Sequence, residues 1–175
     1  LGLVARNAAR NVALPSVPAS DSVDNVWTTD ELRRFLESSA AEPLYPAFVL
    51  AAPTGMRRGE VAALRWVDVD LDSAVVRVEQ SVIPVGGELV FTPPKTKKGV
   101  RQVSLDGGTI AVLRAHRRRQ AERQLAAGSA WVETGRVFTR EDGSHLHPDV
   151  LSKRFDRWVR RAGLPRITFH GLRHT

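Results

Sequence analysis

The sequence predicts a mainly α-helical domain that carries a small antiparallel sheet of three strands. Apolar residues recur at helical spacing in the long stretches on both sides of the sheet region, and short β-branched segments separated by turn residues gather between them. With 175 residues, 42% of them hydrophobic, the chain is long enough to bury one good core and a short appendage.

The N-terminal stretch differs in composition from the rest. Residues 1–14 are typical of the end of a helix that belongs to something upstream, and residues 15–26 form a linker rich in proline and serine. We therefore expect the main domain to cover residues 27–175.

The first helix of this domain begins at a recognisable N-terminal signature. Thr28 can cap the helix, Glu31 can complete a capping box, and Trp27 can pack against Leu32. The predicted buried stripe of this helix is Leu32, Phe35, Leu36 and Ala40.

Two more helices and the sheet follow. Residues 44–52 are apolar nearly all round, which predicts a central helix that ends at Gly55, and another helix begins near Arg57. A Gly86-Gly87 pair suits a hairpin turn between the first two strands. The three predicted strands are residues 75–82, 88–91 and 100–105.

The C-terminal half predicts two long helices with a short strand between them. The first covers residues 108–127 and is closed by Gly128, the strand is 137–138, and the second helix covers 148–162. The core face predicted for this last helix is Leu151, Phe155, Trp158 and Ala162.

Charge is distributed unevenly along the chain. Residues 1–87 hold 8 Lys and Arg against 11 Asp and Glu, a net charge of −3, whereas residues 88–175 hold 18 against 8, a net charge of +10. Such asymmetry favours binding to nucleic acid or an anionic surface, with a solvated basic face as the alternative. Because the chain contains no cysteine, disulfides and thiolate metal sites are excluded, and no apolar run reaches the ~20 residues of a membrane helix. We expect a soluble, intracellular protein.

Three cation-bearing segments, residues 54–60, 93–99 and 170–175, suggest chemistry on a phosphodiester. Attack on phosphorus builds negative charge on the non-bridging oxygens, which fixed arginines can neutralise bidentately. Arg57 and Arg173 are the candidates, with Glu60 to hold Arg57 in place. Lys95 could donate a proton to the leaving oxygen, and His170, three residues before Arg173, could orient the phosphate or assist proton transfer.

These segments resemble the tyrosine recombinases of the phage integrase family. The segment TGMRRGEVAALRW (54–66), followed by Asp68 and Asp70, is similar to the first conserved box of that family. The segment KTKKGVRQVSL (95–105) is similar to its lysine hairpin, and HGLRHT (170–175) is similar to its second box. The order of the boxes matches as well. The resemblance covers residues 27–175 and implies the integrase-type catalytic fold, and it makes residues 1–14 the tail of a preceding DNA-binding domain of the arm type.

The resemblance implies a role for each matching residue. Arg57 and Arg173 would clamp the phosphate, Lys95 would be the general acid, with Lys97 in reserve, and His170 would belong to the His-x-x-Arg box. It implies no metal and no cofactor. The supporting residues would be Glu60 and His174. The DNA-binding candidates are Lys97, Lys98, Arg101, Lys153, Arg154 and Arg157.

In relatives a tyrosine downstream of the second box attacks the phosphate, which gives a 3′-phosphotyrosyl link and a free 5′-hydroxyl. The only tyrosine here, Tyr45, precedes every box, and we expect it to pack in the core. We therefore expect a monomeric piece that binds double-stranded DNA without cleaving it. The parent protein would be a cytoplasmic bacterial or phage recombinase that acts as a tetramer on recombining DNA sites, without a membrane partner.

Two other functions compete with this one. A type IB topoisomerase uses similar chemistry, although the short boxes favour a recombinase. A non-catalytic DNA-binding regulator would instead form a helix-turn-helix within residues 148–175. The recombinase hypothesis requires Arg57, Lys95, His170 and Arg173 to meet in one basic pocket.

Overall fold

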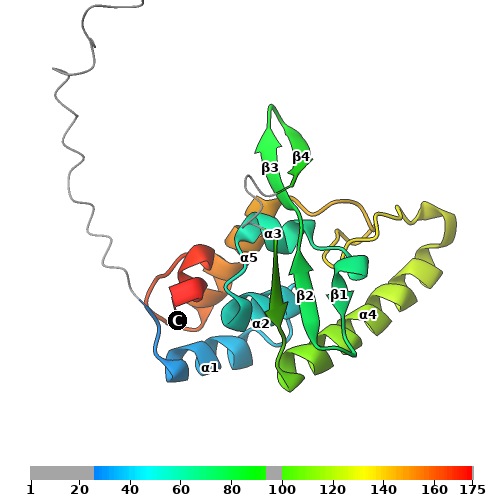
Figure 1. Ribbon diagram of the computed structural model, residues 1–175. Coiled ribbons are helices and arrows are strands. Elements are labelled where there is room, and N and C mark those ends of the chain that lie inside the picture. The colour runs from blue at the N-terminus through cyan, green and yellow to red at the C-terminus, as the bar shows by residue number, and fades with distance from the viewer. Residues whose placement is uncertain (1–25, 94–99, 175) are drawn as a thin grey trace, which may run out of the picture.

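A computed structural model describes residues 26–93 and 100–174 of the chain (Figure 1). Residues 1–14 and nearly all of the predicted linker lie outside the described residues. The α-helices are α1 (Thr29–Ser38), α2 (Tyr45–Thr54), α3 (Arg58–Ala63), α4 (Gly107–Ala127) and α5 (Pro148–Arg161). The strands are β1 (Val69–Asp70), β2 (Val75–Val78), β3 (Ser81–Val85), β4 (Glu88–Thr92) and β5 (Arg101–Ser104). The 3-10 turns are η2 (Trp66–Asp68), η4 (Gly128–Ala130) and η5 (Phe169–His174).

Helix α1 starts with the predicted capping box. The Glu31 backbone N–H donates to the Thr28 hydroxyl at 3.2 Å, and the Thr28 backbone N–H donates to the Glu31 carboxylate at 2.8 Å. Of the predicted stripe, Phe35 is fully buried, whereas Ala40 is exposed. The prediction for Ala40 was wrong because α1 ends at Ser38, so the helical spacing no longer applies there.

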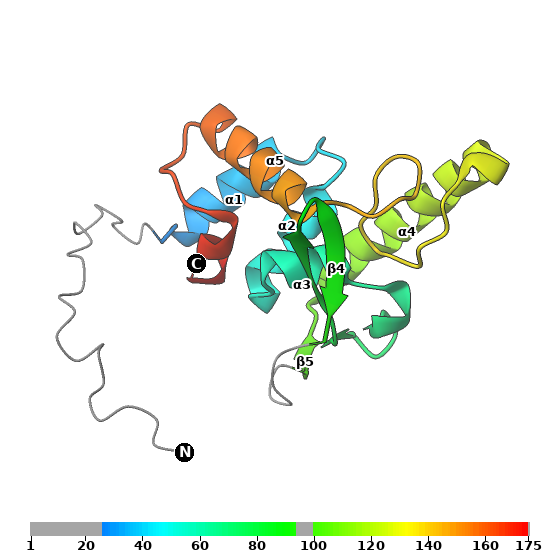
Figure 2. The same ribbon diagram turned by 90° about the horizontal axis from the view of Figure 1, so that it is seen from above.

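An aromatic cluster joins the first and last elements of the domain. Phe35 of α1, Phe48 of α2 and Phe155 of α5 pack with ring centroids 4.8 to 5.8 Å apart. Phe169 of η5 joins them at 5.7 Å from Phe155. Figure 2 shows α1, α2 and α5 together, with the C-terminal turn beside them. The cluster therefore anchors the segment that carries His170 and Arg173, since Phe169 immediately precedes it.

The sheet is split into two parts. Strands β1, β2 and β5 form a three-stranded antiparallel sheet in that order, and β3 pairs with β4 in a separate hairpin that projects from the domain (Figure 1). A three-stranded antiparallel sheet is therefore present, but its members differ from the predicted ones: β1 was not predicted, and the strand predicted at 88–91 is β4 of the hairpin. The strand predicted at 75–82 is two strands, β2 and β3. It breaks at Glu79 and Gln80, whose side chains bond to arginines outside the strands.

The other helix predictions agree with the structure to within two residues at each end. In α5, Leu151, Phe155 and Val159 are buried, whereas Trp158 and Ala162 are only partly buried, so the core face is rotated slightly from the predicted one. Residues 137–138 do not form a strand. They are buried between two isolated bridges, Arg65 with Arg136 and Thr139 with His145.

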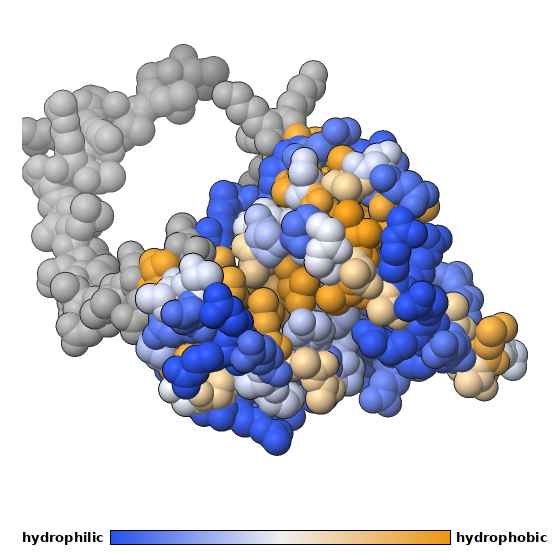
Figure 3. Space-filling view, turned by 90° about the horizontal axis from the view of Figure 1, so that it is seen from below, coloured by the Kyte–Doolittle hydropathy of each residue, from blue (hydrophilic) through white to orange (hydrophobic). Residues whose placement is uncertain are grey.

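The surface is mixed in polarity. On the face shown in Figure 3, hydrophilic residues surround a central apolar patch. Within residues 26–93 and 100–174, none of the helices combines the length and the apolar character that crossing a bilayer demands.

Candidate phosphate-binding site

The turn between α2 and α3 places Arg57 at the start of a helix. Gly55 closes α2 in the left-handed conformation, with φ of +58°, and its N–H donates to the Ala51 carbonyl at 3.0 Å. An L-residue with a side chain rarely adopts this conformation, which explains the glycine. Arg57 is extended and is the N-cap of α3. A cation is disfavoured at this end of a helix, and here the carboxylate of Glu60 in the first turn offsets the charge of Arg57.

The side chain of Arg173 lies over Gly55. A β-carbon added at position 55 would be 3.2 Å from Cγ of Arg173 and 3.8 Å from its Nε. Arg173 comes from η5, which is fixed to the core through the buried Phe169 and Leu172. The absence of a side chain at Gly55 therefore lets the two box arginines, 116 residues apart in the sequence, approach the same turn.

The Glu60 cluster, defined here as Glu60, Arg57 and Arg101, is the polar centre of this region. Arg57 donates to Glu60 through its backbone N–H at 2.7 Å and through Nη1 at 3.1 Å. Arg101 donates to both carboxylate oxygens, at 3.0 and 2.8 Å. Burial raises the pKa of the Glu60 carboxyl, but hydrogen bonds from Arg101 and from the Arg57 backbone outweigh burial and leave the pKa below its ordinary value. The expected contact between Glu60 and Arg57 is therefore present.

Arg57 and His170 line one cavity. It has a volume of about 690 Å³ and lies between α3, β3, α5 and the segment that leads into η5. Lys153 of α5 lines it as well. The Arg57 side chain is 58% exposed although it contacts the buried Glu60. The cavity therefore presents cationic and imidazole groups to whatever occupies it.

Other predicted residues lie elsewhere. Arg154 faces Glu42, with a shortest N–O distance of 3.6 Å, and lines a different cavity. Arg157 is exposed on α5. Arg58, the second arginine of the first box, was not a predicted site residue; it lines the same cavity as Arg57, pairs with Asp149 at 2.8 Å and donates to Ser152. Arg58 thus fastens α3 to α5.

Four predicted residues cannot be placed. Lys95, Lys97 and Lys98 lie outside the described residues. His174 belongs to η5, but its side chain is also outside what the structure describes. Their assigned roles remain predictions.

Two histidines near a turn, His145 and His147, serve local packing. The His145 ring lies 4.7 Å from that of Phe91, and burial lowers its pKa. His147 accepts the Asp149 backbone N–H and so caps α5. In the part of the chain that the structure describes, three or more metal-ligating side chains do not gather at any point.

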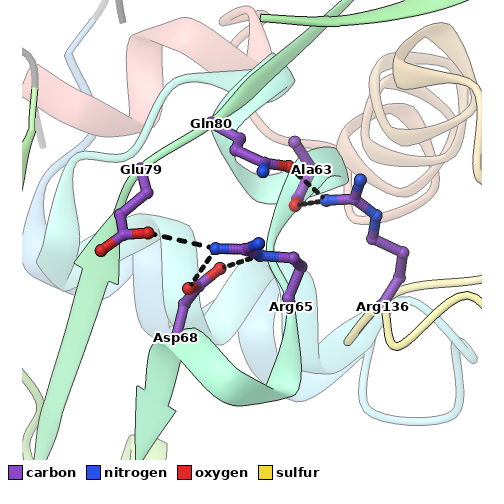
Figure 4. Close-up of polar contacts among 6 residues, drawn as sticks. All are labelled: Ala63, Arg65, Asp68, Glu79, Gln80 and Arg136. Carbon is purple, nitrogen blue, oxygen red and sulfur yellow. Dashed lines mark hydrogen bonds and ion pairs between the residues drawn. The ribbon is translucent and has the colours of Figure 1, made fainter. Parts of the chain in front are cut away.

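A second polar cluster was not predicted from the sequence. The Asp68 cluster, defined here as Arg65, Asp68 and Glu79, follows α3 directly (Figure 4). Arg65 donates through Nε and Nη2 to Asp68, both at 2.7 Å, and through Nη2 to Glu79 at 3.1 Å. The buried Arg136 lies beside it and donates to the Ala63 carbonyl and to Gln80. The cluster fastens the end of the first box to β2.

The role of Gly59 was also not predicted from the sequence. A β-carbon there would meet Ser81 Oγ at 2.6 Å and the Val82 carbonyl at 2.7 Å, so only glycine lets β3 approach α3 this closely. The available signal was a second glycine, directly after the two arginines of the first box.

The fold and the site define a class of protein: a mainly helical domain with a small sheet, in which an arginine of the C-terminal turn lies over the glycine two residues before the arginine at a helix start. Residues 25–175 match the model of the phage integrase family, and the chain belongs to that family. It is 32% identical to the tyrosine recombinase XerC-like protein of Caldanaerobacter subterraneus, over 99% of this chain and 49% of that protein. It is 26% identical to the ICEBs1 integrase of Bacillus subtilis, over 99% of this chain and 47% of that protein.

The fold has a counterpart among solved structures. The integrase of transposon Tn1549, solved in complex with transposon right end DNA, superposes with a TM-score of 0.78 at 20% identity, over 94% of this chain and 56% of that one. This likeness shows the fold, and it agrees with the predicted integrase-type catalytic domain. The chain spans about half the length of the curated relatives it matches.

The two competing functions are not favoured. The regulator required a helix-turn-helix within residues 148–175, but α5 is followed by irregular chain and the 3-10 turn η5, without a second α-helix in residues 162–174. The family match is to integrases, which leaves the topoisomerase alternative without support.

Proposed function

We propose that this chain supplies the phosphate-activating part of a site-specific DNA recombinase whose substrate is double-stranded DNA. One observation carries the proposal: Arg173 lies over Gly55, two residues before Arg57, and His170 lines the same cavity as Arg57. We propose that a single phosphate held between Gly55 and this cavity meets both guanidinium groups and the imidazole. Such a set suits the charge that develops on phosphorus-bound oxygens during transesterification.

The proposed reaction is balanced without a metal or a cofactor. A tyrosine hydroxyl attacks phosphorus and loses its proton, the bond to the 5′ oxygen breaks, and that oxygen leaves as a hydroxyl after it receives a proton. Arg57 and Arg173 hold the non-bridging oxygens, His170 orients the phosphate, and Lys95 gives the proton to the leaving oxygen. The reverse reaction, with a 5′-hydroxyl from another strand, completes strand exchange.

The attacking hydroxyl is not Tyr45. Tyr45 is the first residue of α2, and Gly55 follows its last residue. Tyr45 and Thr54 are nine positions apart along this helix, which at 1.5 Å per residue is about 14 Å. Since Tyr45 is the only tyrosine in the 175 residues, we propose that these residues provide the clamp while the nucleophile lies outside them.

A nicked duplex that traps covalent intermediates tests this proposal. The 175-residue chain is expected to bind the duplex and to form no covalent adduct on a denaturing gel. An adduct that disappears in Tyr45→Phe would contradict the assignment of the nucleophile. A chain that does not bind duplex DNA at low salt would contradict the proposed function as a whole.

The assembly and the location belong to the same proposal. The whole protein would act as a tetramer on two DNA sites in the bacterial cytoplasm, whereas the 175 residues alone would be monomeric. Light scattering after gel filtration of the chain, with and without a duplex, would measure this. A stable oligomer without DNA would contradict it.

A further inference from the structure

Arg101 was predicted to bind DNA, yet the structure places its guanidinium on Glu60. Its Nη1 and Nη2 form a fork on the two carboxylate oxygens. The Arg101 side chain is 29% exposed and the Glu60 side chain 6%. This is the two-nitrogen arrangement that arginine prefers with a carboxylate.

The carboxylate of Glu60 is fully occupied by these contacts. An ionised carboxylate has about four acceptor positions. Oε1 accepts from Nη1 of Arg57 and Nη1 of Arg101, and Oε2 accepts from the Arg57 backbone N–H and Nη2 of Arg101. Because Arg101 takes both oxygens, Arg57 meets Glu60 through one side-chain nitrogen only.

We infer that Arg101 is a positioning residue for the arginine site: it holds Glu60 so that Glu60 orients Arg57 without withdrawing it from the phosphate. This inference rests on the proposed function of Arg57. In the absence of Arg101, Glu60 is free to take Arg57 in a two-nitrogen fork of its own. Arg57 would then turn toward the protein, and the cluster would change from two cations and one anion to one of each.

The chain contains a matched control for this inference. Arg65 also forms a two-nitrogen fork on a buried carboxylate, through Nε and Nη2 to Asp68, with side-chain exposures of 30% and 6%. Removing either arginine breaks an equivalent fork on an equally buried carboxylate. Only Arg101 shares its carboxylate with Arg57, so only its removal is expected to change the arginine site.

The test compares Arg101→Ala, Arg101→Lys and Arg65→Ala with the natural chain by NMR. The first readout is the Nε–Hε signal of Arg57, assigned with Arg57→Lys. The second is the affinity for inorganic phosphate, followed at the same signal. In R101A we expect a shifted Arg57 signal and an affinity about tenfold lower. R101K restores a cation but not a fork, so it recovers part of both, and R65A leaves both unchanged.

Each result decides a different question. An Arg57 signal that is the same in R101A as in the natural chain would overturn the inference, and so would an equal change in R65A. If phosphate does not perturb Arg57 in the natural chain, the proposed function fails, but the Arg57 signal still decides the role of Arg101. If R101A does not fold, R101K provides the same comparison.

Discussion

The Glu60 cluster and the Asp68 cluster are both built from arginines and carboxylates, and they differ in net charge. Each centres on a buried carboxylate held by the two-nitrogen fork of an arginine. In the Asp68 cluster one arginine meets two carboxylates, because Arg65 also reaches Glu79 (Figure 4). In the Glu60 cluster one carboxylate meets two arginines, and the second of them, Arg57, is the more exposed group.

Because of this difference, we assign a structural role to the Asp68 cluster and a binding role to the Glu60 cluster. The three residues of the Asp68 cluster carry one net negative charge, and the buried Arg136 beside them supplies the opposite charge, so the net effect of the cluster is to join α3 to the sheet. The Glu60 cluster has one uncompensated positive charge beside a cavity, where it can meet a phosphate. The net charge of such a cluster therefore says more about its function than the number of ion pairs in it.

The largest expected effect comes from removing the carboxylates. Glu60→Ala leaves two arginines without their partner, and we expect it to reduce the free energy of unfolding by about 3 kcal/mol. Asp68→Ala leaves Arg65 with Glu79 still in place, and we expect a loss of about 2 kcal/mol. Urea denaturation would measure both. A larger loss in D68A than in E60A would break the comparison.

The second prediction tests the contact between Arg173 and Gly55 by comparing two glycine substitutions. Gly55→Ala and Gly163→Ala both place a side chain at positive φ, at +58° and +63°, and each is expected to cost roughly 1 kcal/mol of stability. Only G55A pushes against Arg173, since an added β-carbon at 163 meets no atom within 4 Å. DNA affinity should therefore fall in G55A alone. Equal DNA affinities in the two variants would show that the position of Arg173 over Gly55 does not affect DNA binding.

The third prediction concerns the phosphate contact itself. Arg57→Ala and Arg173→Ala are each expected to lower DNA affinity uniformly across sequences and to reduce the slope of log affinity against log salt by about 1. Arg114→Ala is the control, because Arg114 pairs with Asp72 away from the cavity. The measurement is fluorescence anisotropy of a duplex at several salt concentrations. A reduced slope in R114A would mean that the measurement reports general charge.

The smallest effect is a pH dependence. The pKa of Glu60 is below its ordinary value of 4.5 in the folded chain, so its contribution to stability is present above that value and is lost as the pH falls through the lower, folded pKa. Glu60→Gln cannot titrate and should lose less stability than the natural chain between neutral pH and acid. Urea denaturation at several pH values would measure this. Parallel curves for the two proteins would contradict the assigned pKa.

Much of the fold was predictable because its signals are local. The capping box at Thr28, the apolar stretch of α2 and the glycine after α4 each predicted an element that the structure contains. The split of residues 75–82 was not predictable, because it depends on Arg65 and Arg136, which are far from Glu79 and Gln80 in the sequence. The strand predicted at 137–138 fails for a similar reason, since that segment is buried by α4 and the end of α3.

The candidate site was only partly predictable. Arg57, His170 and Arg173 could be selected because the charge requirement of a phosphate and a family resemblance agree on them. The role of Arg101 could not be predicted, because a basic residue at a strand end has the same appearance in sequence whether it meets DNA or a buried carboxylate. The contact between Gly55 and Arg173 could not be predicted either, because it joins residues that are distant in the sequence and has no local sequence signal.

The central claim is that Arg57 and Arg173 hold one and the same phosphate. A crystal of this chain soaked in tungstate, a tetrahedral oxyanion that is visible by anomalous scattering, tests it directly. We predict a single ion in the cavity between α3 and η5, within hydrogen-bond distance of both guanidinium groups. Two ions, each held by one arginine, or an ion held at neither, would contradict the claim.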